Sequence, residues 1–320
     1  MTTTHSSLPL RVIFVLGAGR SGSTVLDTLL GNHPQAESVG ELANLVRAYE
    51  ANEYCACGKR CQDCPFWREV WSQWWSSGGD SLRYQELQRR FERPRAMVRS
   101  MVAKRAASPL FREYEEATRR CLTSVAEVSG QRVLVDSSKN PGRALALSRI
   151  DGIDLRLVHL VRDARGVAYS GAKAFTRDET QGLEQDIRSM APRRTATSWL
   201  LANLVSSLVT RAVPVENRLL LRYEDLMADP RQALQALGRV TGLNCEPWVE
   251  AVEQGRALEV GHTVSGNRVR MKGKLRLKPD LEWLTHLSAA DERTVRRLCG
   301  PLMRRYGYRL DAKESTSGQS

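Results

Sequence analysis

Short apolar runs along the chain alternate with longer segments whose apolar residues recur at helical spacing. Four runs rich in valine, isoleucine and leucine have the character of buried strands: residues 11–16, 132–136, 155–161 and 218–223. Helical patterns lie between them, beginning with residues 24–32. Strands that alternate with helices are typical of a mostly parallel sheet with helices on its faces. The pattern therefore predicts an α/β fold that binds ligands at the carboxyl edge of its strands.

The organisation of the chain predicts a single domain over residues 8–310. Residues 50–130 are charged and rich in helix formers, and we expect them to form a helical insertion between the first two strands. Residues 311–320 are polar and are expected to be disordered. With 320 residues, the chain is long enough to bury a sizeable core.

Two apolar features are expected to be buried. Trp71, Trp74 and Trp75 are spaced for one face of a helix, which predicts that all three belong to the core. The longest apolar stretch, residues 200–215, is interrupted by polar residues and by Pro214. It predicts a buried helix, because a membrane span needs about 20 consecutive apolar residues.

The most informative motif follows the first apolar run. Gly17-Ala-Gly-Arg-Ser-Gly-Ser-Thr24 joins a predicted strand to a predicted helix, which is the arrangement of a phosphate-binding P-loop. Glycines allow positive φ angles, so that successive N–H groups can point at one anion, and the helix N-terminus adds further donors. Ser23 stands where nucleotide triphosphatases have a lysine, and the nearest cation is Arg20. A loop without that lysine favours a nucleotide that has no γ-phosphoryl group to transfer.

Two blocks of this sequence resemble the donor site of a known enzyme family. The stretch from Gly19 through Thr24 to Glu41 is similar to the 5′-phosphosulfate loop of sulfotransferases that use 3′-phosphoadenosine 5′-phosphosulfate (PAPS). Residues 157–170 are similar to the family's 3′-phosphate block, with its arginine at a strand end and its serine eight residues later. Further similarities lie at residues 136–139, 221–226 and 266–270, so the resemblance covers most of residues 10–310.

The resemblance implies a bacterial-type sulfotransferase, related to the carbohydrate and tyrosyl-protein enzymes, that moves a sulfuryl group from PAPS to a hydroxyl or amine and releases PAP. The residues it assigns to the nucleotide are Gly19, Arg20, Ser21, Gly22, Ser23, Thr24, Arg162, Ser170, Tyr223, Arg268, Arg270 and Lys272. In-line displacement needs positive charge near the leaving phosphate, and Arg20 and Lys139 are expected to supply it. No catalytic metal is expected. The insertion at 50–130 is expected to form the acceptor side.

A general base near the acceptor is also required. Glu41 is the first choice, because tyrosyl-protein sulfotransferases place a catalytic glutamate after a similar His-Pro…Gly-Glu segment. Those enzymes have two adjacent glutamates, whereas Leu42 follows here. Cytosolic sulfotransferases use a histidine instead, which leaves His262 and His286 as alternatives. The other histidines are expected to be terminal, helix-capping or part of the core: His5, His33 and His159.

A formal net charge of +12 would attract any polyanion. The sequence has no nucleic-acid recognition motif and no aromatic residues interleaved with its basic ones, so we expect no specific nucleic-acid partner. Residues 268–278 hold six cations whose alternation places them on one face of an extended segment. That segment is either a solvated loop or a flap over the 3′-phosphate. A cationic pocket is expected, since PAPS carries about four negative charges.

Four of the seven cysteines lie within ten residues: Cys55, Cys57, Cys61 and Cys64. Four thiolates at this spacing could close a tetrahedral, structural zinc site, and the alternative is a reduced or redox-labile loop. A similar Cys-x-Cys-Gly…Cys-Pro-Phe-Trp pattern in bacterial members of the family supplies three of the cysteines and leaves Cys61 as an extra one.

Two other function classes stay open at this point. A P-loop kinase-like enzyme would need the missing lysine and a magnesium-binding aspartate, for which Asp136 is the nearest residue. A non-catalytic nucleotide- or polyanion-binding module would need neither. The N-terminus has no basic start and no apolar core, so neither a signal peptide nor a membrane anchor is expected, and a cytoplasmic location follows.

Overall fold

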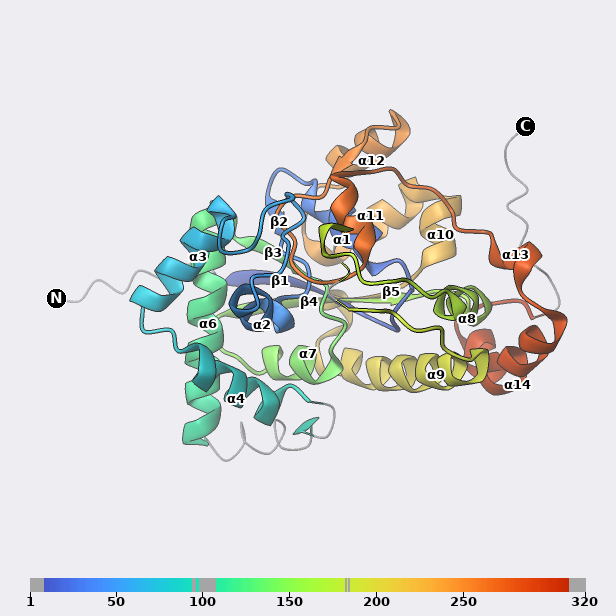
Figure 1. The fold of residues 1–320 in the computed structure, drawn as a ribbon, viewed down its shortest axis with the longest axis horizontal. Helices are drawn as coiled ribbons and strands as arrows, with labels where there is room; N and C mark the ends of the chain where they lie inside the picture. Colours follow the sequence, from blue (N-terminus) through green and yellow to red (C-terminus); the bar gives the residue numbers. More distant parts are fainter. Residues whose placement is uncertain (1–8, 94–95, 98–107, 182, 184, 311–320) are drawn as a thin grey trace.

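The computed structural model describes residues 9–93, 96–97, 108–181, 183 and 185–310. The expected tail at 311–320 and His5 lie outside the described residues. A five-stranded sheet with the order β2-β3-β1-β4-β5 forms the centre of the molecule (Figure 1), and all neighbouring strands are parallel. The strands are β1 Leu10–Leu16, β2 Ala36–Ser38, β3 Val133–Asp136, β4 Ile153–Val161 and β5 Arg218–Arg222. The predicted α/β class is confirmed.

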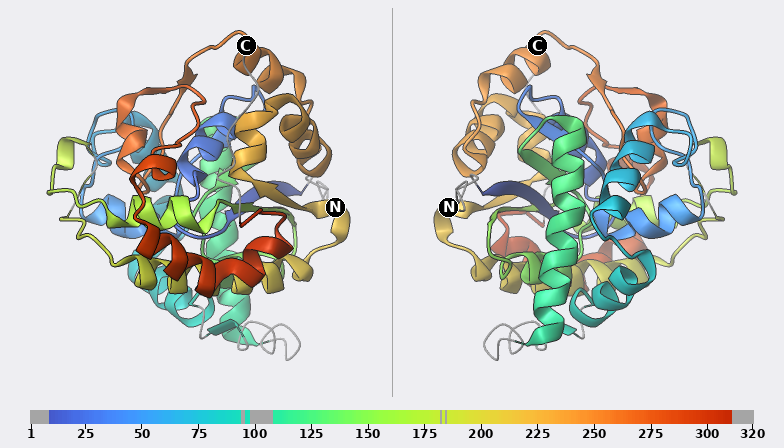
Figure 2. Two further views of the ribbon diagram at one scale, coloured as in Figure 1. Left: turned by 90° about the vertical axis from the view of Figure 1, so that its right-hand side faces the viewer. Right: turned by 90° about the vertical axis from the view of Figure 1, so that its left-hand side faces the viewer.

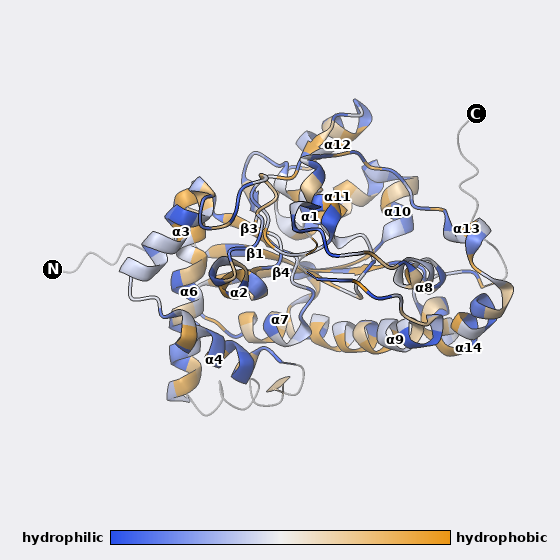
Figure 3. Ribbon diagram, viewed as in Figure 1, coloured by the Kyte–Doolittle hydropathy of each residue, from blue (hydrophilic) through white to orange (hydrophobic). Residues whose placement is uncertain are grey.

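Alternate residues of the strands supply two separate cores. Val12 and Phe14 of β1 face one side of the sheet, while Ile13 and Val15 face the other, and all four are fully buried. Burial on both faces explains why the strands read as continuous apolar runs. Figure 3 shows these apolar strands at the centre, with polar residues toward the outside of the surrounding helices.

Helices cover both faces of the sheet and its two ends. The core of Ile13 and Val15 is closed by α1 Ser23–Gly31, α10 Tyr223–Ala228, α11 Pro230–Thr241 and α12 Glu246–Glu253. The core of Val12 and Phe14 is closed mainly by α2 Leu45–Glu50, α3 Pro65–Ser76, α4 Ser81–Phe91, α6 Pro109–Ser129 and α7 Pro141–Leu147. A third cluster joins α8 Ala164–Ala172, α9 Pro192–Val209 and α14 Ala289–Arg305. The short α13 Trp283–His286 lies beside α8.

The stretch predicted as a helical insertion contains α3, α4 and α6, and both α3 and α4 pack against α6. Figure 2 shows the long α6 crossing one end of the molecule, with α3 and α4 beside it. The prediction that all three tryptophans are buried is wrong for Trp75, which is 58% exposed. The buried stripe of α3 runs through Trp67, Val70 and Trp74, and the next residue after Trp74 falls about 100° away from it.

The prediction of a buried helix at 200–215 is only half right. One face of α9 holds Trp199 and Asn203, and Asn203 Oδ1 accepts a hydrogen bond from Nε2 of the His159 ring at 3.0 Å. The leucines of the opposite face are exposed: Leu201, Leu204 and Leu208. Polar residues therefore occupy the buried face of this apolar run. No helix among the described residues is long and apolar enough to cross a membrane.

A buried carboxyl group joins α1 to the short strand β2. The Ser38 hydroxyl donates to Asp27 Oδ2 at 2.5 Å, and Asp27 is 2% exposed. Burial raises the pKa of Asp27 from its ordinary 3.8 to about 7, although hydrogen bonds from Ser38 and Ser137 oppose the shift. The folded chain therefore holds the Asp27 proton more tightly than the unfolded chain does.

Asp27→Asn should remove a pH-dependent loss of stability. With the folded pKa raised, the contribution of Asp27 is complete below its unfolded pKa and is lost as the pH rises through about 7. As the pH rises from roughly 5 to 8, the free energy of unfolding of the variant, measured with urea, should increase by about 2 kcal/mol relative to that of the wild type. A wild-type-to-variant difference that stays constant over this range would show that Asp27 does not titrate there.

Candidate active site

A pocket of about 960 Å³ opens at the carboxyl edge of the sheet. Its lining collects residues from the segments that follow β1, β3, β4 and β5: the loop at 19–25, Lys139, Arg162, Ser170 and Tyr223. The remaining wall comes from segments around residues 41–60, 175–187 and 265–280. Both predicted phosphate motifs therefore meet in one cavity, at the edge where α/β sheets bind ligands.

The loop after β1 has a backbone that glycine alone accommodates without strain. At Gly17, φ is 136°, and an added Cβ atom would lie 2.1 Å from the carbonyl oxygen of Leu160. Gly22 caps α1 with φ of 90°, and a Cβ atom there would lie 2.6 Å from the Tyr223 ring. Within the described part of the chain no side chain caps α1. The N–H groups of Val25 and Leu26 donate to the carbonyl oxygen of Gly22, which leaves those of Ser23 and Thr24 as donors for an anion.

Backbone strain is concentrated around this pocket. Within the described ranges, the residues other than glycine with positive φ are Arg20, Asn52, Lys139 and Ser265. Arg20, Lys139 and Ser265 line the pocket, and Asn52 lies between two residues that also line it. Non-glycine residues in this region cost roughly 1–3 kcal/mol each and cluster at functional sites.

Five of the six predicted loop residues line the pocket: Gly19, Arg20, Gly22, Ser23 and Thr24. Ser21 does not, because its side chain turns inward, where the buried hydroxyl finds no partner among the described residues. Burial lowers the pKa of Arg20, and the positive charge of Arg268 lowers it further. A bound anion would therefore offset the burial and the charge repulsion that disfavour the charged form of Arg20.

Arg162 and Ser170, the residues of the second motif, line the same pocket next to the loop. Arg162 is 4% exposed and donates to the carbonyl oxygen of Arg20 at 3.2 Å. Its other guanidinium nitrogen lies 3.0 Å from a carboxylate oxygen of Asp280. The guanidinium also lies over the Tyr223 ring, 4.9 Å from its centroid. Ser170 lies on α8 and lines the same cavity, so the structure brings together the residues predicted for the 3′-phosphate.

Glu41 and Lys139 form an ion pair in the pocket wall, with 2.5 Å between Oε1 and Nζ. Lys139 Nζ also donates to the carbonyl oxygen of Ser137 at 2.9 Å, and Glu41 Oε2 accepts from the Asn44 side chain at 2.9 Å. The Glu41 N–H donates to the carbonyl oxygen of Val264 at 3.0 Å. These contacts fix a carboxylate and an ammonium side by side at the edge of the cavity.

The basic segment differs from the predicted extended strand with one cationic face. Arg268–Lys272 form a 3₁₀ helix, and Lys274–Leu275 (β7) pair with Leu258–Glu259 (β6). Arg268 and Arg270 line the pocket, whereas Lys272 is exposed and lies outside the lining, so its predicted contact with nucleotide is not supported. A helical turn directs successive side chains to different sides, which the period-two pattern did not anticipate.

None of the described histidines lines the pocket. His159 is a core residue, as predicted, and burial lowers its pKa to about 4. The His33 ring bridges the amide of Gln35 and the carbonyl oxygen of Asn244. His286 bonds to Glu282 and Thr285 at the surface. His262 lies beside the cysteine loop.

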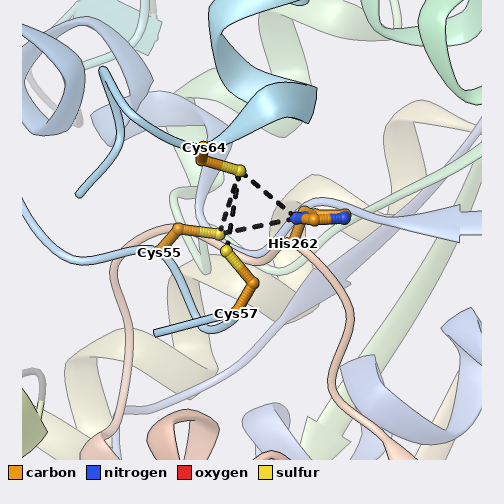
Figure 4. A group of neighbouring side chains, drawn as sticks. All are labelled: Cys55, Cys57, Cys64 and His262. Carbon is orange, nitrogen blue, oxygen red and sulfur yellow. Dashed lines mark hydrogen bonds between the residues drawn. The ribbon is translucent and has the colours of Figure 1, made fainter. Parts of the chain in front are cut away.

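The cysteine loop is assembled differently from the predicted four-thiol set. Figure 4 shows Cys55, Cys57 and Cys64 converging on the His262 ring, and their ligand atoms lie within 4.8 Å of one another. Cys61 is buried nearby but is not among these four residues, so His262 takes the place that the four-thiol set gave to it. No local pattern links His262 to the cysteines, because about 200 residues separate them and only the fold makes them neighbours.

Several residues of the pocket carried no sequence signal. Phe175 and Ile187 belong to a hairpin-like segment joined by two backbone hydrogen bonds, and both line the cavity. Arg60 lines it too and pairs with Glu179 at 2.9 Å. Asp136, the nearest magnesium ligand for a kinase, is fully buried and accepts a hydrogen bond from Arg143 at 2.9 Å. A metal in the pocket therefore has no access to it.

Comparisons with known proteins agree with this site. The model of the sulfotransferase family matches residues 12–247. Carbohydrate sulfotransferase 5 of Mus musculus is 30% identical over 173 residues, which cover 49% of this chain and 42% of the relative. Carbohydrate sulfotransferase 6 of Homo sapiens is 29% identical over 167 residues, with the same two coverages. The chain thus matches less than half the length of these relatives.

Solved sulfotransferases can be superposed along most of the chain. The sulfotransferase domain of the Synechococcus olefin synthase is 22% identical, with a TM-score of 0.47 and coverage of 96% of this chain and 98% of that one. A sulfotransferase of Mycobacterium avium is 11% identical, with a TM-score of 0.43 and coverage of 96% and 79%. The match of the family model spans most of the chain and includes both phosphate motifs, and the chain therefore belongs to the sulfotransferase family.

Proposed function

We propose that this protein transfers a sulfuryl group from PAPS to a hydroxyl or amine acceptor. The observation that carries the proposal is the meeting of three parts in one pocket: the glycine loop with its free helix N-terminus, the Arg162–Ser170 block, and the Glu41–Lys139 pair. A nucleotide with phosphate groups at both its 3′ and 5′ positions would use the first two parts. The third part would lie at the reacting sulfur.

The loop is proposed to hold the 5′-phosphosulfate. Arg20, Ser23 and Thr24 all line the cavity, and they offer a guanidinium, two hydroxyls and the first two N–H groups of α1. These donors would stabilise the negative charge that grows on the 5′-phosphate as it leaves. The lowered pKa of Arg20, caused by burial and by Arg268, is consistent with a site built for an anion.

Arg162 and Ser170 are proposed to bind the 3′-phosphate. A phosphate group that approaches Arg162 would compete with the Asp280 carboxylate, which now lies 3.0 Å from the guanidinium. A phosphate that carries close to two charges is a stronger partner than one partly exposed carboxylate. Arg268 and Arg270 lie across the same cavity and would add positive charge.

Glu41 is proposed as the general base and Lys139 as the cation at the transferred group. The acceptor oxygen would attack sulfur while its proton passes to a Glu41 carboxylate oxygen. The bond between sulfur and the 5′-phosphate oxygen breaks, and PAP leaves with that electron pair. Lys139, 2.5 Å from Glu41, would face the oxygens on which charge develops.

The acceptor is proposed to enter between Glu41 and the wall formed by Phe175, Ile187 and Arg60. Of the predicted insertion at 50–130, only the short segment before α3 contributes to the lining of the described pocket, through Ala51, Glu53 and Arg60. Two relatives are named carbohydrate sulfotransferases, so a sugar hydroxyl is the first acceptor class to test. Tyrosine peptides, lipids and small phenols complete the panel.

Arg162→Ala should weaken PAP binding more than AMP binding. A charge-assisted hydrogen bond contributes about 1.5–3 kcal/mol, so the affinity for PAP should fall by roughly tenfold or more while that for AMP changes little. Isothermal titration of both ligands measures the ratio. Lys173→Ala, which removes a cation outside the pocket, should leave the ratio unchanged. Equal losses for PAP and AMP would contradict the assignment of Arg162.

Glu41→Gln should lower kcat by about 10²- to 10⁴-fold and leave the affinity for PAP nearly unchanged, because amide nitrogen and oxygen cannot take the acceptor proton. The assay follows label from [³⁵S]PAPS to whichever acceptor of the panel the wild type modifies. Glu50→Gln is the control, since Glu50 is exposed and lies outside the pocket lining.

Two outcomes of this assay would count against the proposal. Full turnover by the Glu41→Gln variant would show that another group is the base. Tight binding of PAP without transfer of label to any acceptor class would favour a nucleotide-binding module over an enzyme.

A further inference from the structure

We infer that Cys55, Cys57, Cys64 and His262 form a structural zinc site. Cys55 and Cys64 are fully buried, His262 is half-buried and Cys57 is exposed, so the group lies just beneath the surface. The four ligand atoms are three sulfurs and His262 Nδ1 (Figure 4). Three thiolates and one imidazole are a common ligand set for structural zinc.

Four of the six distances between the ligand atoms lie close to the edges of a zinc tetrahedron. Zinc–sulfur bonds of about 2.3 Å and zinc–nitrogen bonds of about 2.1 Å give edges of roughly 3.8 Å between sulfurs and 3.6 Å between sulfur and nitrogen. The Cys64 sulfur lies 3.7 Å from that of Cys57 and 3.8 Å from that of Cys55. His262 Nδ1 lies 3.3 Å from the Cys64 sulfur and 3.9 Å from the Cys55 sulfur.

A disulfide does not account for this geometry. All seven cysteines are free, and bonded sulfurs would lie about 2.05 Å apart. A disulfide would also bring only two sulfurs together, whereas three sulfurs lie around one imidazole nitrogen here. Cys61, which the spacing in the sequence would include, is not among the four residues whose ligand atoms converge.

The backbone around the group is already held in place. The Cys55 amide donates to the carbonyl oxygen of Lys59 at 2.8 Å, and the Gly58 amide donates to the carbonyl oxygen of Cys55 at 3.0 Å, which forms a tight turn between the ligands. Cys64 ends this loop at the start of α3, where its amide donates to the carbonyl oxygen of Arg60 at 2.8 Å.

The fourth ligand is oriented by two aromatic residues of α3. The Trp67 indole N–H donates to the carbonyl oxygen of His262 at 2.6 Å. The Phe66 ring stacks on the His262 ring, with 5.0 Å between centroids and an interplanar angle of 7°. Such contacts around a metal ligand fix the orientation of its ring. The Cys-Pro-Phe-Trp sequence thus supplies one thiolate and both contacts to the distant histidine.

Four protein ligands would leave no coordination position for a substrate, so the metal would be structural. It would join the loop at 55–64 to the segment at 262–270, and both flank the pocket. Arg60 lies within the loop and lines the pocket, while Arg270 donates to the carbonyl oxygen of Tyr54 at 3.0 Å. The zinc would therefore hold one wall of the pocket without touching the nucleotide. This inference does not depend on the proposed function.

Metal analysis of protein purified without a histidine tag tests the site directly. The wild type should contain about one zinc per chain. Cys57→Ala and His262→Ala should lose most of this zinc, whereas Cys61→Ala should keep it. Cys57 is exposed, so its substitution leaves the core intact. Removal of zinc with a chelator should lower the Tm of the wild type and of Cys61→Ala, because metal binding and folding are coupled.

Cobalt provides a second measurement on the wild-type chain, in case a variant does not fold. Co²⁺ added to chelator-treated protein should give the visible absorption of a tetrahedral site together with thiolate-to-cobalt charge transfer. Two results would overturn the inference. The first is a wild type that holds no metal, binds no Co²⁺ and has a Tm that ignores zinc. The second is loss of zinc in Cys61→Ala with retention in His262→Ala, which would restore the four-thiol set.

Discussion

The pocket depends on the close passage of one loop against two neighbouring segments. The loop after β1 has to pass against the carbonyl oxygen of Leu160 on β4 and against the Tyr223 ring after β5, and only glycines at 17 and 22 leave room for this. Parallel pairing of β1 with β4 fixes the carbonyl, and pairing of β4 with β5 brings the ring into place. The donors of the first turn of α1 are thereby aimed into the cavity, where the residues after β3 and β4 meet them.

Charge is arranged so that the pocket is cationic without being strongly repulsive. Most of its cations have an acidic neighbour: Lys139 pairs with Glu41, Arg162 with Asp280 and Arg60 with Glu179. Arg20 differs, because the charged side chain that lowers its pKa among the described residues is another cation, Arg268. Desolvation and like charge disfavour the charged form of Arg20. A bound anion would pair with Arg20 in the way that acidic side chains of the protein pair with Lys139, Arg162 and Arg60.

The features that depend on residues close together in the sequence could be predicted. Four strands, the glycine loop and the position of Arg162 could be identified, because apolar runs and turn residues report directly on strands and turns. Strand β2 was missed, since three residues carry no periodicity. Trp75 is exposed and not buried as predicted, because a spacing gives the relative direction of side chains and not the direction of the core. The helical turn at Arg268–Lys272 could not be predicted from the period-two alternation of its cations. The fourth partner of the cysteines could not be found, because its contact spans about 200 residues.

The central claim is that the pocket binds a nucleotide with separate 3′- and 5′-phosphate groups. Calorimetric titration of the wild-type chain with PAP, with magnesium ATP and with a single-stranded oligonucleotide tests this claim most directly. On this proposal PAP should bind with one site per chain and more tightly than the other two ligands, because both of its phosphate ends would meet donors in the pocket. Tighter binding of magnesium ATP would indicate a kinase-like pocket, and tighter binding of the oligonucleotide would indicate a polyanion-binding module. Either result would contradict the account.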